Sequence, residues 1–179
     1  MRLTVIMTFL ALLIMPGIAE PDNVTTGLYK VTFDLGMPKE AYNVDIEDPL
    51  TKESLSGEIS TKYEIKLINK TGLTRRATII LTSYETEQVI PTQDEFVQGA
   101  KYTALQLDDL YDIESAGRKI DGHDGAVVAG KMRSNGMEID TYSAMYFPSS
   151  TTNAVIVSFY PWEDGTLQLL KTIHIEKMK

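Results

Sequence analysis

The chain has 179 residues, with 17 basic and 25 acidic side chains, no cysteine, a formal net charge of −8 and a pI near 4.8. This length suits one domain with a sizeable core. The acidic balance argues against nucleic acid or an anionic membrane surface as the main partner, because both require a basic face. The lack of cysteine excludes disulfides, thiol nucleophiles, thiolate zinc sites and iron–sulfur clusters.

The first residues have the pattern of an export signal. Arg2 provides a basic start, residues 3–15 are apolar apart from two threonines, and Gly17 and Ala19 place small side chains where a signal peptidase reads. A membrane-spanning helix needs about 20 apolar residues, whereas this run is shorter and is followed by a Pro-Gly pair. We expect residues 1–19 to be a cleaved signal peptide and the mature chain to be secreted or at the cell surface, without a membrane span. An uncleaved membrane anchor is the alternative.

The rest of the chain is expected to form one domain. Residues 20–27 are polar and predict a flexible leader, and residues 28–179 predict a single α+β domain. Apolar and polar side chains alternate at residues 28–35 and 42–46, which indicates two half-buried strands. Residues 59–84 contain two further alternating runs on either side of a turn-forming NKTG sequence, and they predict a β-hairpin.

A helix is predicted next. Thr92 and Glu95 have the spacing of a capping box, in which each side chain satisfies a backbone amide of the other residue. Apolar residues then recur at three- and four-residue steps, at Phe96, Val97, Ala100, Ala104, Leu107 and Leu110. This spacing predicts an amphipathic helix that extends to about Tyr111.

Strands predominate after this helix. They are predicted at residues 113–120, 126–132, 137–147 and 153–160. Residues 122–125 predict a turn, and Asn135-Gly136 is the favoured pair for a type I′ hairpin turn. Residues 167–173 predict a short helix before an extended ending. The order predicts a mainly antiparallel sheet covered by one long and one short helix.

This order of elements resembles the PsbP family, extrinsic lumenal proteins of photosystem II with relatives in non-photosynthetic prokaryotes. The similarity covers roughly residues 28–177, and it rests on the aromatic strand at 29–33, Gly122 before the apolar strand at 126–128, and the closing strand and helix at 155–160 and 167–175. The resemblance implies an α/β/α sandwich, export, and binding to a larger assembly rather than catalysis. The basic character of plant members and the lipid-anchoring cysteine of cyanobacterial members are missing, so the resemblance supports no photosynthetic role, and no family metal or contact residue carries over.

Asp121, His123 and Asp124 form the densest group of potential metal ligands in the sequence. Carboxylate and imidazole donors on a glycine-containing loop suit a divalent cation. The same residue types are also typical of a tight turn between two strands. The sequence therefore leaves two interpretations: a plain turn that needs no cofactor, and a site for a divalent cation.

Three aromatic residues are candidates for a partner-binding surface. Trp162 follows a predicted strand, and Tyr142 and Tyr146 lie on the same face of another one. Trp and Tyr are enriched in protein interfaces, although a lid over the hydrophobic core is an equal alternative for Trp162. Asn23 and Asn69 begin N-x-T sequons and are candidate glycosylation sites in an exported protein.

The sequence contains none of the common catalytic motifs, such as the G-x-S-x-G elbow, HExxH, the phosphate-binding loop or the dinucleotide fingerprint. The leading prediction is therefore an exported, non-catalytic domain that binds a protein or a small ligand at the cell envelope. The alternative is a divalent-metal-binding domain or metal-dependent enzyme that uses the 121–125 loop.

Overall fold

A computed structural model of the protein describes residues 21–70, 75–107, 109–134, 136–159 and 165–178. From the N-terminus, its elements are β1 (Asp22–Thr26), β2 (Tyr29–Phe33), the 3₁₀ helix η1 (Lys39–Ala41), β3 (Tyr42–Ile46), β4 (Leu50–Glu53), β5 (Ile59–Asn69), β6 (Arg75–Tyr84), α1 (Gln93–Leu105), β7 (Leu110–Ile120), β8 (His123–Ser134), β9 (Met137–Ser149), β10 (Thr152–Ser158), α2 (Leu167–Thr172) and β11 (His174–Lys177). The predicted signal peptide, residues 1–19, lies outside the described residues.

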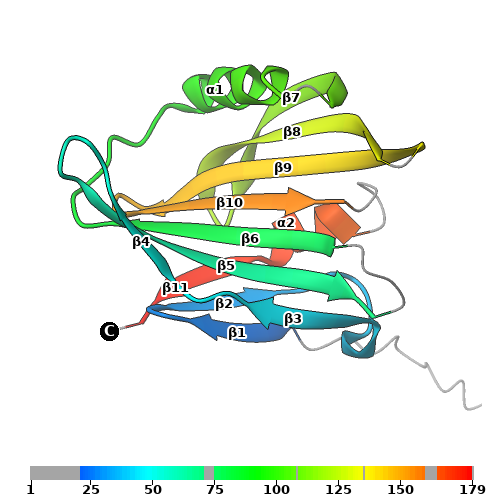
Figure 1. The fold of residues 1–179 in the computed structure, drawn as a ribbon, viewed down its shortest axis with the longest axis horizontal. Coiled ribbons are helices and arrows are strands. Elements are labelled where there is room, and N and C mark those ends of the chain that lie inside the picture. The colour runs from blue at the N-terminus through cyan, green and yellow to red at the C-terminus, as the bar shows by residue number, and fades with distance from the viewer. Residues whose placement is uncertain (1–20, 71–74, 108, 135, 160–164, 179) are drawn as a thin grey trace, which may run out of the picture.

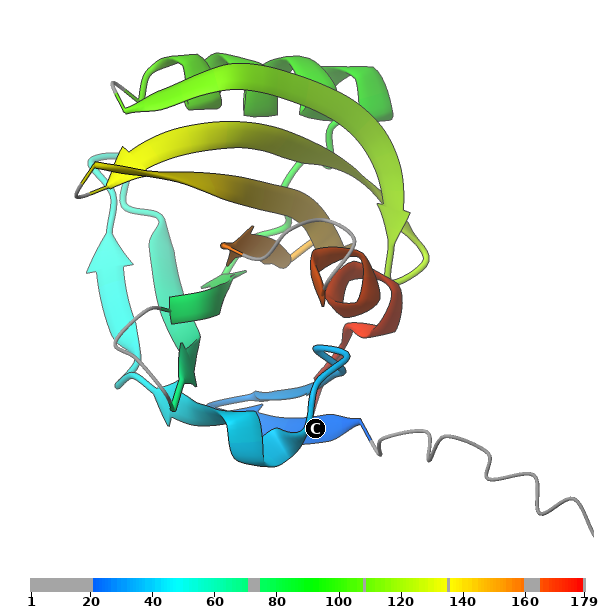
Figure 2. The same ribbon diagram turned by 90° about the vertical axis from the view of Figure 1, so that its right-hand side faces the viewer.

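The strands form two antiparallel sheets (Figure 1). The large sheet has eight strands in the order β3-β5-β6-β10-β9-β8-β7, with β4 also paired to β5. The small sheet has the order β1-β2-β11 and so brings the two ends of the described chain together. Figure 2 shows the large sheet curving around the small sheet and α2, which lie on its inner face, while α1 lies on its outer face near β7 and β8.

The expected α/β/α sandwich is wrong, because the layer on the inner face of the large sheet is mainly a second sheet rather than helices. The long helix is also shorter than predicted: it ends at Leu105, and β7 begins at Leu110. Leu107 and Leu110 continue the helical spacing, but Leu110 instead pairs with Met132 of β8. Sheet pairing therefore overrides the apolar periodicity beyond the helix end.

The predicted hairpin at 59–84 is confirmed as β5 paired with β6, and the predicted C-terminal helix and extended ending are confirmed as α2 and β11. The prediction of a flexible leader was wrong for residues 22–26, which form β1 against β2. Alternate side chains of β1 are buried, at Asp22, Val24 and Thr26. Only one of these three side chains is apolar, so the sequence shows no clear alternation of apolar and polar residues that would predict a strand.

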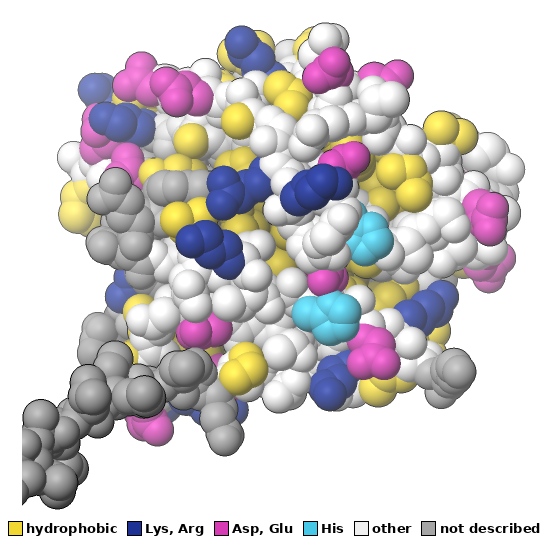
Figure 3. Space-filling view, turned by 180° about the vertical axis from the view of Figure 1, so that it is seen from behind, with side chains coloured by type: hydrophobic (Ala, Val, Ile, Leu, Met, Phe, Trp, Pro, Cys, Tyr) yellow, Lys and Arg dark blue, Asp and Glu magenta, His cyan; other side chains and the backbone are white. Residues whose placement is uncertain are grey.

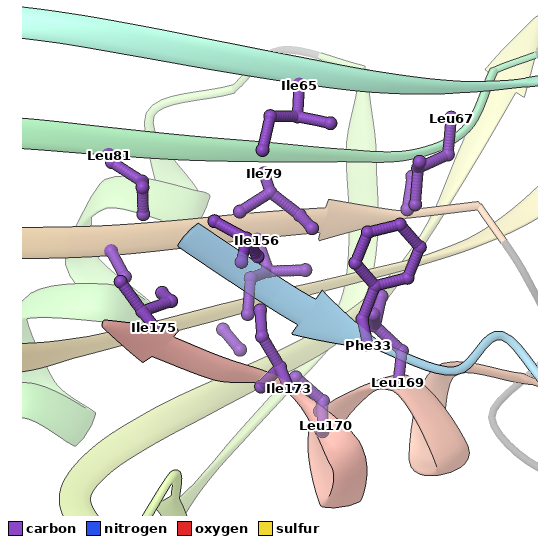
Figure 4. Close-up of a cluster of buried hydrophobic side chains, with 14 of the residues drawn as sticks. Phe33, Ile65, Leu67, Ile79, Leu81, Ile156, Leu169, Leu170, Ile173 and Ile175 are labelled. Carbon is purple, nitrogen blue, oxygen red and sulfur yellow. The ribbon is translucent and has the colours of Figure 1, made fainter. Parts of the chain in front are cut away.

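The main core lies between the two sheets. Figure 4 shows its side chains, which come from the inner face of the large sheet, from β2, and from α2 and β11. The largest of those that are almost completely buried include Tyr29, Phe33, Ile65, Leu67, Ile79, Leu81, Ile156 and Leu169. Since complete burial of one such aliphatic or phenyl side chain contributes about 1.5–3 kcal/mol, this interface stabilises the fold without any disulfide.

The capping box at the start of α1 is confirmed. The Glu95 amide donates to the Thr92 hydroxyl, and the Thr92 amide and hydroxyl both donate to the Glu95 carboxylate at 2.8 Å. The backbone hydrogen bond from Thr92 is the main cause that lowers the pKa of Glu95 below its ordinary value of 4.5. The box therefore holds the first turn of α1 most firmly when Glu95 is ionised.

A buried carboxylate connects the two sheets near the N-terminus. Asp22 of β1 accepts a hydrogen bond from the hydroxyl of Tyr42 at the start of β3, and Lys39 of η1 lies 2.5 Å from its other oxygen. Asp22 is only 7% exposed, so its charge depends on these two partners. The cluster thereby attaches an edge strand of the small sheet to an edge strand of the large one.

We expect Asp22→Ala to lower the free energy of unfolding by about 2–3 kcal/mol, because it removes a charge-assisted hydrogen bond from a buried hydroxyl. Lys39→Ala is the matched control, and it should cost much less because the lysine side chain is 71% exposed. Chemical denaturation of both variants measures the difference. Equal losses would show that the Tyr42–Asp22 hydrogen bond does not hold β1.

Acid should weaken the start of α1. The pKa of Glu95 is lowered in the folded chain, so the ionised side chain stabilises the fold. This stabilisation is complete above about pH 4.5 and is lost as the pH falls through the folded-state pKa. Glu95→Gln keeps the hydrogen-bonding shape but does not titrate. Its melting temperature should therefore fall less steeply than that of the unaltered protein between about pH 5 and about pH 3, and parallel profiles would contradict this role.

Candidate functional site

A groove on the outer face of the large sheet runs beside the C-terminal end of α1. It encloses a cavity of about 530 Å³. Its apolar lining comes from three parts of the chain: Leu107 and Leu110 after α1, Val128 and Met132 of β8, and Val157 of β10. We call this space the outer groove.

The outer groove follows from strand alternation and from the position of α1. On β9 and β10, the residues beside those that face the core point outward, as Ser143 and Val157 do. The helix packs mainly against β7 and β8, and no other described element lies over the β9–β10 part of this face (Figure 2). Gly130 allows the chain after α1 to lie close to β8, because a Cβ atom there would be 3.0 Å from a methyl carbon of Leu110.

A second, narrower lobe continues the outer groove towards α1. It has a volume of about 190 Å³ and shares Leu107, Leu110 and Ser143 with the larger cavity. Its other lining residues are small or flexible, and they include Ala100, Ala104, Ala126, Met145 and Val155. The alanines of α1 keep the helix from filling this space, so the two lobes form one elongated site.

Four polar side chains reach the outer groove without a hydrogen bond or ion pair to any other described residue. They are Gln106 and Asp109 at the chain segment after α1, and Thr141 and Ser143 on the β9 floor. Among the described lining residues, Asp109 is the only charged one. The groove therefore offers an apolar channel with hydrogen-bonding groups and one negative charge.

The inner face carries a separate and more polar groove. Its cavity of about 390 Å³ is lined by Glu114 and Arg118 of β7, Val127 and Ala129 of β8, and the predicted partner-binding residue Tyr142. Arg118 and Tyr142 are already engaged in interactions within the chain. The inner groove is therefore less suited to bind an apolar ligand than the outer groove.

The predicted aromatic surface does not form as a unit. Tyr146 is fully buried, and burial raises the pKa of its hydroxyl, which has no hydrogen-bond partner among the described residues. It belongs to the core, whereas Tyr142 on the same face lines the inner groove. Trp162 lies outside the described residues.

The three predicted metal ligands each contact different residues. Asp121 accepts from the amide of Ile175 at 3.0 Å and lies 2.7 Å from Nδ1 of His174, while the His123 ring stacks on Tyr146. Asp124, the third predicted ligand, forms an ion pair of 2.9 Å with Lys119. In the described residues, no three His, Asp or Glu side chains are grouped so that they could hold a metal ion.

The 121–125 loop instead contains a tight turn between β7 and β8, and Asp121 in this turn contacts β11. Asp121 and Gly122 have φ values of 52° and 79°, and β8 begins at the next residue. Both histidines lie on the face shown in Figure 3. His174 was missed in the sequence because 53 residues separate it from Asp121.

The two predicted glycosylation sites differ in accessibility. Asn23 of β1 is exposed, and its side-chain oxygen accepts from the Thr32 hydroxyl at 2.8 Å. Asn69 at the end of β5 is half-buried, and the amide orientation that satisfies its neighbours donates to the Ala41 carbonyl at 3.2 Å and accepts from Arg76 at 2.8 Å. Attachment at Asn69 would require these contacts to break.

Substitutions at Asp121 separate its side-chain contacts from its backbone conformation. Asp121→Ala loses the contacts to His174 and Ile175 and also places a Cβ-bearing residue at positive φ with nothing to hold it there. Asp121→Gly loses the same contacts but accepts the conformation freely. The alanine variant should therefore be less stable than the glycine variant by about 1 kcal/mol in chemical denaturation. The opposite order would show that the turn is not held in this conformation.

No protein-family model matches the chain, and no curated protein matches it. Across the described ranges, neither helix is long and apolar enough to cross a membrane.

Proposed function

We propose that this chain is an extracytoplasmic, non-catalytic domain that binds a small apolar ligand in the outer groove. The observation that carries this proposal is the elongated, mainly apolar groove of about 530 Å³, which a second lobe extends. Small-molecule sites are typically concave spaces of about 300–1,000 Å³ with an apolar lining and a few polar groups. The outer groove has this composition.

The surface beside the groove also favours a bound ligand. Leu107, which follows α1 and lines both lobes, is 57% exposed. An exposed apolar side chain in the lining of a groove favours ligand binding, because covering it removes apolar surface from water. A ligand in the groove would shield Leu107 and the half-buried Val157.

The polar groups of the groove support binding rather than nucleophilic catalysis. A serine or threonine nucleophile needs a hydrogen-bonded base that removes its proton. The hydroxyls of Thr141 and Ser143 make no hydrogen bond to any described side chain, and neither histidine lines the groove. Their role in this proposal is to orient a ligand. The signal-like pattern of residues 1–19 supports the extracytoplasmic location.

Ser143→Phe should weaken binding of N-phenylnaphthylamine, a neutral dye whose fluorescence rises in apolar surroundings. The new ring fills the junction of the two lobes without removing a hydrogen bond to any described residue. We expect the unaltered protein to bind the dye and the variant to bind it at least about tenfold more weakly, since burial of a ligand ring is lost. Fluorescence titration measures both affinities.

Ala129→Phe is the matched control, because it adds the same ring to the inner groove. It should leave dye binding within about twofold of the original, and thermal melting of both variants confirms that they fold. Thr141→Leu provides a smaller obstruction of the outer groove if Ser143→Phe does not fold. The proposal would be overturned if Ala129→Phe lost dye binding while both outer-groove variants kept it.

A further inference from the structure

We infer that the ligand of the outer groove is a single-chain amphiphile with a cationic, hydrogen-bond-donating head group, such as a long-chain ammonium. This inference rests on the proposed function, and it adds the chemical class of the ligand. It is drawn from the charges and shapes of the two lobes.

The charge of the site selects the head group. Asp109 lines the larger lobe, is exposed, and has no ion-pair or hydrogen-bond partner among the described residues. None of the described lining residues of either lobe is Lys, Arg or His. A cation near Asp109 therefore gains an opposite charge, whereas a carboxylate or phosphate would meet a like charge and find no positive partner.

The hydrogen-bonding groups of the larger lobe can accommodate the same head group. A carboxylate can only accept hydrogen bonds, and the Gln106 amide oxygen and the Thr141 and Ser143 hydroxyls add further acceptors in the same lobe. An ammonium group provides three donors and no acceptor. The Gln106 amide and the two hydroxyls can also donate, so the Asp109 carboxylate is the group that discriminates, and it favours a donor-rich cation.

The narrow lobe selects the tail. It is lined by Ala100, Ala104, Ala126, Met145 and Val155, and the only polar side chains in its lining are Ser143, which is shared with the larger lobe, and Thr103. The Thr103 hydroxyl is already bonded to the Gly99 carbonyl at 2.9 Å. An unbranched hydrocarbon chain fits a lobe of about 190 Å³ and needs no hydrogen bonds there, so the head group stays near Asp109.

The test compares three ten-carbon compounds that differ only in the head group: decylammonium, decanol and decanoate. Each displaces N-phenylnaphthylamine from the full chain at neutral pH and low salt, below its micelle concentration. We expect decylammonium to bind about fivefold more tightly than decanol, and decanoate to bind at least about fivefold more weakly, because each head group differs by one charge interaction with Asp109.

Asp109→Asn removes the charge and keeps the size of the side chain. It should bring the affinities of decylammonium and decanol within about twofold of each other while the affinity for decanol itself stays unchanged. Asp94→Asn, on the first turn of α1 and outside the outer groove, is the matched control and should keep the full preference.

The outcomes separate the two proposals. If the compounds displace the dye equally, or if Asp109→Asn keeps the preference for decylammonium, the cationic head group is wrong although the apolar site stands. If none of the compounds displaces the dye, or if the dye does not bind, the proposed function fails as well.

Discussion

The packing of the small sheet and α2 against the inner face of the large sheet is the constraint on which the rest of the structure depends. Val31 of β2 pairs with Ile175 of β11, so segments from opposite ends of the chain form one layer of the core. This layer covers the inner-facing side chains of β5, β6 and β10. With no cysteine in the chain, apolar burial and a few buried polar contacts must hold the two sheets together.

The outer face of the large sheet is covered, among the described elements, by α1 alone. Phe96 is the large buried anchor of this helix, and its ring lies 6.0 Å from that of Phe147 on β9. The C-terminal half of the helix presents alanines to the sheet, so it leaves space instead of filling it. The outer groove therefore has two causes. The main core lies on the inner face of the large sheet, and α1 packs against the outer face tightly at its start and loosely at its end.

Local patterns predicted much of the secondary structure. The period of two in β2, β5 and β6 and the Thr92–Glu95 capping box needed only neighbouring residues, and the structure confirms them. The strand β3 forms as well, although Ile46 at its end is exposed rather than buried. The pairing of β6 with β10 joins Ile79 to Ile156, and no local signal specifies such a distant partner. The layer that covers a sheet is likewise a tertiary property, which is why the expected α/β/α sandwich was wrong.

The site was harder to predict than the strands. Val128, Ser143 and Val157 look like ordinary members of alternating strands, and only the position of α1 leaves them open. The available signal was the pair Leu107 and Leu110, whose helical spacing continues past the end of the helix. Asp121 was identified as a chemically notable residue, but its partner His174 lies on a different sheet.

The account depends most on the outer groove being the place where a ligand binds. Methyl and amide NMR spectra, recorded while decylammonium is added, test this directly. The account predicts that signals of Val128, Met145 and Val157 in the outer groove shift together, while those of Val127 and Ala129 in the inner groove stay in place. Shifts confined to the inner groove, or none at saturating ligand, would contradict it.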